Sequence, residues 1–341
     1  MCRRRHVMLV LAVSAAARGA EPSAVLTVGP GAEHADIASA VAAAPAGAIV
    51  RVGPGTYRGR VTIDRDVTVE GAGWDRTTVI VEQPPFEQLA AARQEFMQAS
   101  RKVGDERERE RLSRAYGEQW TNAAITVAGG ASVTVRGLKV TSSPSSLPEA
   151  GMSNPQALVA VEPGGTLRLD RCAVVGSPGD GLRVASGGVV DVDGCLVAAA
   201  QSVGIAVAPH PHRDAPARVT VRGSDVRNCY HMGISIGRGR DATIGRCRIS
   251  GSAWHGIRYD DAGPRVTGNH IFGNAHCGIY ASGQTAAVVE ENLFVGNEID
   301  GMSCWFQNAD TVRRNTFAGN AREGLAVLGA SAPTVDRNLF V

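Results

Sequence analysis

The C-terminal part of the chain repeats itself. Residues 269–291 read NHIFGNAHCGIYASGQTAAVVEE, and residues 292–314 read NLFVGNEIDGMSCWFQNADTVRR. Both copies begin with Asn and carry, further on, a Gly that is followed by Ile or Met. Aligned on this glycine, five copies can be read, with steps of 22 or 23 residues, at Gly233, Gly256, Gly278, Gly301 and Gly324. Self-similarity at a fixed period is typical of a solenoid.

The length of the period indicates the kind of solenoid. A repeat built from a pair of helices needs about 33 residues or more, and a leucine-rich repeat shows regularly spaced leucines that are absent here. Each copy instead holds short runs of alternating residues, such as Gly-Ile-Tyr-Ala, separated by Gly and Asn. Such runs are typical of strands and tight turns. We therefore predict an all-β fold, a parallel β-helix of roughly ten coils.

The glycine and asparagine coils resemble the PbH1-type repeat of the right-handed parallel β-helix (pectin-lyase-like) superfamily, over most of residues 24–341. This superfamily includes lyases, hydrolases, esterases, epimerases and proteins without activity, so the resemblance implies a fold and no single function. The composition agrees with a narrow solenoid filled by aliphatic side chains, because 44% of residues are apolar and only 5% are aromatic. The net charge of +2 provides no field for nucleic acid, and an acidic polymer would need a local basic groove.

The N-terminus has the features of an export signal. Arg3, Arg4 and Arg5 precede a short apolar stretch that ends in small residues at 15–17. We predict a signal peptide over residues 1–19 and a secreted or periplasmic protein. The apolar stretch is too short to span a bilayer, so no membrane insertion is expected.

Residues 24–341 are predicted to form the β-helix, with an amphipathic helix near residues 35–44 that closes its N-terminal end. An open end coil is an unpaired edge, and a cap is physically required there. The opening resembles that of pectin-methylesterase-like proteins. Residues 84–121 break the repeat and are predicted to form a charged helical insertion. The sequence ends at Phe340 and Val341, directly after a predicted strand, so we expect either that the natural C-terminus is longer or that a partner or a second copy covers this end.

Two columns of the repeat are predicted to point inward. Asn269, Asn292, Asn315 and Asn338 form the first, in which stacked amides can hydrogen-bond along the axis. Cysteines 172, 195 and 247 occupy the same column earlier in the chain. We interpret them as buried free thiols, with a Cys172–Cys195 disulfide as the alternative.

The candidate site lies where reactive residue types gather on three neighbouring coils. Alternate residues of a strand face outward and equivalent positions stack about 4.8 Å apart. The catalytic candidates are His255, Arg258 and Tyr280, and the substrate-binding candidates are Asp260, Asp300 and Trp305.

These residue types suit an acidic polysaccharide as partner. A uronate lyase or C5-epimerase removes the proton beside a carboxylate, which requires a cation and a proton-transfer group. Arg258 is expected to neutralise the carboxylate, Tyr280 or His255 to move the proton, and Trp305 to stack on a sugar ring. No metal ligand is assigned in this set, and the sequence names no cofactor.

Several alternatives stay open. Arg258 and Asp260 can form a surface ion pair of little energetic value. The motifs of the hydrolases, methylesterases and pectate lyases of this fold are absent, so a non-catalytic surface or scaffold protein competes with the enzyme. A second hypothesis places copper or zinc on His210 and His212, with Asp214 or His231, in the Pro-rich loop 209–214.

Overall fold

A computed structural model describes residues 24–82, 86–105, 107–109, 111–112, 123–143, 157–207, 217–237 and 241–341. The predicted signal peptide and the loop 209–214 with its histidines lie outside these residues. In the described part, no helix has the length and apolarity needed to cross a membrane.

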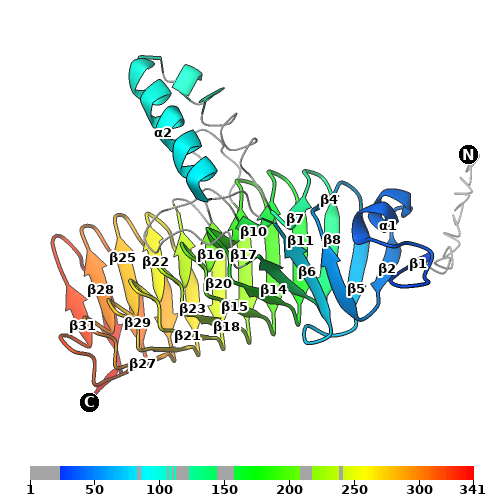
Figure 1. Ribbon diagram of the computed structural model, residues 1–341. Coiled ribbons are helices and arrows are strands. Elements are labelled where there is room, and N and C mark those ends of the chain that lie inside the picture. Colours follow the sequence, from blue (N-terminus) through cyan, green and yellow to red (C-terminus); the bar gives the residue numbers. More distant parts are fainter. Residues whose placement is uncertain are drawn as a thin grey trace, which may run out of the picture.

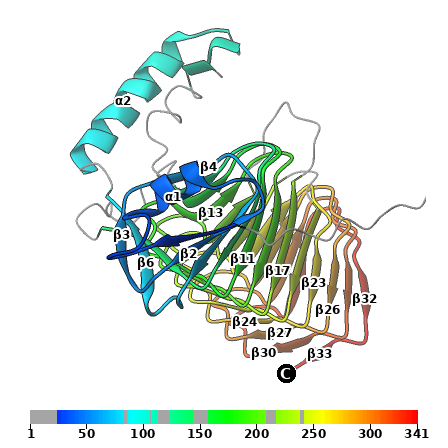
Figure 2. The same ribbon diagram turned by 90° about the vertical axis from the view of Figure 1, so that its right-hand side faces the viewer.

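The chain winds into a solenoid with three parallel sheets (Figures 1 and 2). Each coil contributes one strand to each sheet, so a strand pairs with the equivalent strand of the next coil. This arrangement confirms the predicted parallel β-helix. The twelve strands of the first sheet, sheet A, are β1 (Val25–Val28), β2 (Ala48–Val52), β5 (Val67–Gly71), β8 (Ser132–Arg136), β11 (Thr166–Asp170), β14 (Val189–Asp193), β17 (Arg218–Arg222), β20 (Asp241–Gly245), β23 (Arg265–Thr267), β26 (Val288–Glu290), β29 (Thr311–Arg313) and β32 (Thr334–Asp336).

The other two sheets complete each coil. Sheet B has eleven strands: β3 (Gly55–Arg58), β6 (Thr77–Val81), β9 (Lys139–Ser142), β12 (Ala173–Val175), β15 (Leu196–Ala198), β18 (Asp225–Arg227), β21 (Arg248–Ser250), β24 (His270–Phe272), β27 (Leu293–Val295), β30 (Thr316–Ala318) and β33 (Leu339–Phe340). Sheet C has ten: β4 (Val61–Ile63), β7 (Ile125–Val127), β10 (Ala157–Val161), β13 (Asp180–Val184), β16 (Ile205–Val207), β19 (Ile234–Ile236), β22 (Ile257–Asp260), β25 (Ile279–Ser282), β28 (Met302–Trp305) and β31 (Leu325–Val327).

The repeated glycine is required by the close approach of neighbouring coils. A Cβ atom added to Gly256 would lie 2.7 Å from the carbonyl oxygen of Gly278, and one added to Gly278 would lie 2.6 Å from that of Gly301. Neither distance is compatible with a side chain. The 22- and 23-residue period of the sequence is therefore the spacing that brings one glycine above the next.

The interior is filled as the composition predicts, with stacked valine, isoleucine and leucine and few aromatic rings. The asparagine column lies inside it. Each amide in this column donates to the next coil's Oδ1 and to a backbone carbonyl, and its own Oδ1 accepts in turn from the coil before. A second ladder, which was not predicted from the sequence, joins Asn274, Asn297 and Asn320 in the same way. The inward column is confirmed, and its polar atoms are satisfied within it.

The cysteines that the structure describes are all buried and free, including Cys172, Cys195 and Cys247. The predicted inward position is confirmed, and the alternative disulfide between Cys172 and Cys195 is not formed.

In the part of the chain that the structure describes, helices α1 and α2 depart from the coil pattern. Helix α1 (Ile37–Ala43) begins at Asp36, whose carboxylate accepts from the backbone N–H of Ser39, and it buries Ile37 and Val41. It lies at the N-terminal end of the solenoid (Figure 1), which confirms the predicted cap. Helix α2 (Phe86–Lys102) follows β6 and projects away from the solenoid in both views (Figures 1 and 2). At the opposite end, the last coil exposes apolar side chains of Val335, Leu339 and Phe340.

The asparagine ladder generates a prediction for stability. Asn292→Leu removes four side-chain hydrogen bonds and leaves buried amide and carbonyl groups of the adjacent coils without partners. We expect a loss of about 2–4 kcal/mol in the free energy of unfolding, measured by urea denaturation, and a lower Tm. Gln307→Leu removes an exposed amide from a similar coil-to-coil pair and should change stability by no more than about 0.5 kcal/mol. Equal stability of the two variants would contradict a structural role for the ladder.

The buried carboxylate of Glu290 generates a prediction for pH dependence. It accepts hydrogen bonds from Arg265, Arg313 and Arg314. Burial alone would raise its pKa, but the hydrogen bond from Arg313 and the charges of the three arginines outweigh burial and hold the pKa below its ordinary value. A lowered pKa stabilises the folded state at neutral pH, and this stabilisation disappears as the pH falls through the folded-state pKa.

Glu290→Gln should therefore cost about 1–3 kcal/mol at pH 7, since the arginines are partly exposed and screened by solvent. The difference from the wild type should shrink steadily below about pH 4.5, the ordinary pKa of the group. Glu291→Gln is the control, because that side chain is exposed and has one ion pair. A destabilisation of Glu290→Gln that does not change with pH would show that the charge is not its cause.

Candidate functional site

The outer face of sheet C places the predicted residues in vertical files, by which we mean equivalent positions on successive coils. The pairing of β22, β25, β28 and β31 puts Arg258, Tyr280, Ser303 and Ala326 in one file. The neighbouring file contains Asp260, Ser282 and Trp305. The alternation along each strand sends these side chains outward and buries Tyr259 between them.

The three predicted catalytic residues are in contact. The rings of His255 and Tyr280 are stacked, with centroids 4.7 Å apart and an interplanar angle of 20°. The Cζ atom of Arg258 lies over the Tyr280 ring as well, 5.7 Å from its centroid. The guanidinium also donates to both oxygens of Asp260, at 2.8 and 3.1 Å. Tyr280 is therefore in contact with an imidazole and with a paired arginine, both from the preceding coil.

A cleft of about 520 Å³ opens beside Tyr280. Of the six predicted residues, Tyr280, Asp300 and Trp305 line it, whereas His255, Arg258 and Asp260 do not. It is lined by His276, Cys277, Tyr280, Ile299, Asp300, Ser303, Trp305, Arg322, Glu323, Leu325, Ala326, Val327 and Leu328. Among the described residues, the guanidinium of Arg322 has no hydrogen-bond or ion-pair partner. The free cation of this cleft is thus Arg322, which the sequence analysis did not select.

In the three coils of the site, the residue just before the repeated glycine is buried. His255 is 4%, Cys277 is 1% and Asp300 is 4% exposed. Burial, followed by the charges of His276 and Arg258, lowers the pKa of His255 to about 3. Burial raises the pKa of the Cys277 thiol to about 12, and the Asp300 carboxylate adds to this effect. At neutral pH this part of the site holds a neutral imidazole and a protonated thiol.

Aromatic rings continue from the cleft toward the preceding coils. Successive ring centroids in this aromatic strip lie 4.6 to 6.5 Å apart. Trp254 is half-exposed and Phe306 is exposed, so part of the strip faces solvent. Its members are Tyr230, His231, Trp254, His255, His276, Tyr280, Trp305 and Phe306.

A further file of the repeat borders the site and was not predicted from the sequence, although the alignment of the glycines contains it. Two residues before each repeated glycine stand His231, Trp254, His276, Ile299 and Arg322. The backbone N–H of each of the last four donates to the carbonyl of the one before, so they stack along the axis. These residues sit in turns, where strand alternation does not predict which way a side chain points. The coil-to-coil spacing alone indicates that they share one edge of the site.

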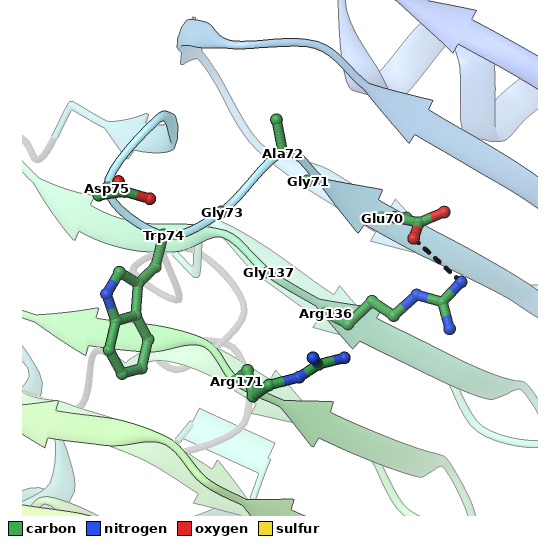
Figure 3. A pocket seen from close by; sticks show the side chains of 9 residues that line it. All are labelled: Glu70, Gly71, Ala72, Gly73, Trp74, Asp75, Arg136, Gly137 and Arg171. Atoms are coloured by element: carbon green, nitrogen blue, oxygen red, sulfur yellow. Dashed lines mark ion pairs between the residues drawn. The ribbon is translucent and has the colours of Figure 1, made fainter.

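A second hollow of about 460 Å³ lies near the N-terminal end, where β5 leads into the turn before β6 (Figure 3). Its charges are largely paired, Glu70 with Arg136 at 3.1 Å and Arg171 with Asp170 at 3.2 Å. Trp74 presents its ring at the rim beside Arg171 (Figure 3). This hollow is several coils away from the cleft and contributes no residue to it.

The comparisons with known proteins agree with this architecture. The family model described as "Right handed beta helix region" matches residues 180–340, which include the whole cleft. Over these residues the model agrees with the three parallel sheets of the structure, and the fold is a right-handed parallel β-helix. No curated protein matches the sequence.

Solved structures match this β-helix along most of its length. Pectate lyase Pel9A is 12% identical with a TM-score of 0.57, and the match covers 92% of this chain and 79% of that one. The surface adhesin PfbA of Streptococcus pneumoniae is 12% identical with a TM-score of 0.52, over 89% and 86% of the two chains. ORF18 of Geobacillus virus E2 is 10% identical with a TM-score of 0.58, over 86% of this chain and 54% of its own. At these identities the likeness concerns the fold.

Proposed function

We propose that the β-helix binds an acidic polysaccharide in the cleft on sheet C and acts on its uronate residues. The observation that carries this proposal is the combination of aromatic rings and a cation in one open cleft. The rings are those of Tyr280 and the exposed Trp305, and the cation is Arg322, whose guanidinium has no partner among the described residues. Pectate lyase Pel9A shares the fold and is named for an acidic polysaccharide, which supports the same substrate class. Export remains a prediction that agrees with an extracellular or periplasmic polymer.

The rings suit sugars because a pyranose presents a face of C–H groups that packs on an aromatic surface. Trp305 is 36% exposed, and its Nε1 donates to the hydroxyl of Ser303 at 2.9 Å, which fixes the ring orientation. Tyr280 lies one coil earlier, with its centroid 6.3 Å from that of Trp305. Rings on consecutive coils form a platform that runs along the solenoid, and such a platform fits an extended chain better than a compact ligand.

Charge determines which polymers fit. Arg258 is already held by Asp260 through two hydrogen bonds, so a substrate carboxylate would have to compete for it. Arg322 has no such competitor and lines the cleft. We therefore assign to Arg322 the carboxylate contact that sequence analysis gave to Arg258. Arg258 then positions the Tyr280 ring.

The reaction class follows from the groups beside that contact. Removal of the proton next to a uronate carboxylate, followed by loss of the oxygen at C4 or by return of a proton on the other face, gives β-elimination or C5 epimerisation. We assign the proton transfer to Tyr280 in the cleft wall. Its phenolate takes the proton, and the phenol so formed returns it to the departing C4 oxygen; in epimerisation, solvent supplies the proton to the other face. His255 is buried behind the Tyr280 ring and does not line the cleft, so we assign it a positioning role.

Binding can be tested by affinity electrophoresis and calorimetry with polygalacturonate and alginate, with a neutral glucan as reference. Arg322→Ala and Trp305→Ala should each weaken polyuronate binding about tenfold, since each removes an interaction worth about 1–2 kcal/mol. Arg337→Ala is the control, because this exposed arginine is also near the C-terminal end but is paired with Asp336. Wild-type affinity that is equal for the neutral glucan, or unaffected in Arg322→Ala, would contradict the proposed role of charge.

Turnover can be tested by ultraviolet absorbance of unsaturated ends for elimination and by NMR of the product for epimerisation. Tyr280→Phe should lower the rate about 10²–10⁴-fold and leave polymer affinity close to that of the wild type. Tyr230→Phe is the control, because Tyr230 belongs to the aromatic strip but not to the cleft. Polymer binding without turnover by either readout would instead favour the non-catalytic alternative, a surface or scaffold protein.

A further inference from the structure

Three side chains at the base of the cleft bring metal-ligating atoms together. His255, His276 and Cys277 each offer one such atom, and these atoms all lie within 4.8 Å of one another. His255 and Cys277 are buried, whereas His276 is half-buried. His255 comes from one coil, and His276 and Cys277 come from the next, so the fixed coil spacing holds the group in place.

The distances are close to those of a formed site. Cys277 Sγ is 3.4 Å from His276 Nδ1. Two ligands on one tetrahedral zinc ion, with a Zn–S bond of about 2.3 Å and a Zn–N bond of about 2.0–2.1 Å, lie about 3.5 Å apart. The separations that involve His255 are at most 4.8 Å.

A second observation points to a missing partner. The Nδ1 atom of His255 is buried and has no hydrogen-bond partner among the residues that the structure describes. A buried polar atom is normally satisfied, and one that is not requires an explanation such as a bound ion. Around the same group, Asp300 Oδ2 lies 3.8 Å from Cys277 Sγ, and Asp300 Oδ1 accepts from the backbone N–H of Glu323.

We propose that His255, His276 and Cys277 bind one first-row transition metal ion of borderline softness, such as Zn²⁺. Imidazole and thiolate together favour Zn²⁺, Co²⁺ or copper over Mg²⁺ and Ca²⁺, which take oxygen ligands. The thiol loses its proton to solvent when the ion binds. His276 and Cys277 also line the cleft, so three protein ligands leave a coordination position on the cleft side, as in zinc sites that act on substrates.

The same residues could be interpreted as a cysteine nucleophile with a histidine base and an aspartate. The geometry disfavours this interpretation, because Cys277 is 1% exposed and its neighbour His276 is adjacent in the chain. A nucleophile must reach a substrate atom, whereas a metal ion can be bound by a sulfur that is almost fully covered. The metal site does not depend on the proposed polysaccharide activity and can be tested without it.

The test uses the full chain, freed of metal by a chelator and kept reduced. We expect Zn²⁺ titration against a chromophoric chelator to give one tight site per chain, and Co²⁺ to give an intense near-ultraviolet thiolate band together with visible bands of tetrahedral Co²⁺. Cys277→Ser should abolish the thiolate band and weaken Zn²⁺ binding more than about 100-fold. Loss of a residue that only hydrogen-bonds to a ligand lowers metal affinity about 10–100-fold, and loss of the ligand itself should lower it further.

Matched variants separate ligation from folding. Cys247→Ser changes another buried free cysteine, and His270→Ala changes a histidine on sheet B that stacks on Phe272, so both should keep the site. His276→Ala removes a half-buried ligand and should lose binding while its circular dichroism and Tm in the absence of metal stay close to those of the wild type. A wild type without a tight site, or a thiolate band that persists in Cys277→Ser, would overturn the proposal. A site that survives these substitutions but is lost in Cys247→Ser would overturn it as well.

Discussion

The structure depends on one constraint, the stacking of successive coils at hydrogen-bonding distance. Parallel strands pair about 4.8 Å apart, so every coil must present the same backbone path as its neighbours. At the glycine column this approach leaves no room for a Cβ atom, as the 2.6 Å and 2.7 Å separations from neighbouring carbonyl oxygens show. A coil has no complete core of its own, and its buried surface exists only between the coil before and the coil after.

This stacking also solves the problem of polar groups inside the solenoid. The turn carbonyls and amides that face the interior cannot reach water, and the asparagine ladders satisfy them with identical amides placed one coil apart. The same register acts on the surface with a different result. There, the files do not need identical residues, so Arg258, Tyr280 and Ser303 can occupy one file and create a local site on a regular scaffold. A short insertion elsewhere on the coil leaves that register unchanged.

The candidate site combines two environments that lie within one turn of the chain. The outward positions of β25 and β28 contribute the exposed rings and line the cleft, whereas the positions before the glycines turn inward and bury His255, Cys277 and Asp300. Burial keeps the imidazole neutral and the thiol protonated in the absence of a metal ion. A site of this kind offers a solvent-accessible surface to which a polymer can bind. Beside it, buried side chains can bind an ion, so one protein can bind both.

The sequence by itself determined the fold, the period, the N-terminal cap, the inward asparagine column and the outward file that runs through Arg258 and Tyr280. These features follow from a repeat whose spacing equals one coil and from strand alternation, both of which are local rules. Only the tertiary structure shows that Asp260 forms an ion pair with Arg258 and that His276 and Cys277 lie beside His255. It also shows that, among the described residues, Arg322 is the cation of the cleft without an ion-pair partner. Those outcomes depend on the rotamers of turn residues and on contacts between coils, where no periodic rule fixes the direction of a side chain and only packing against the next coil selects it.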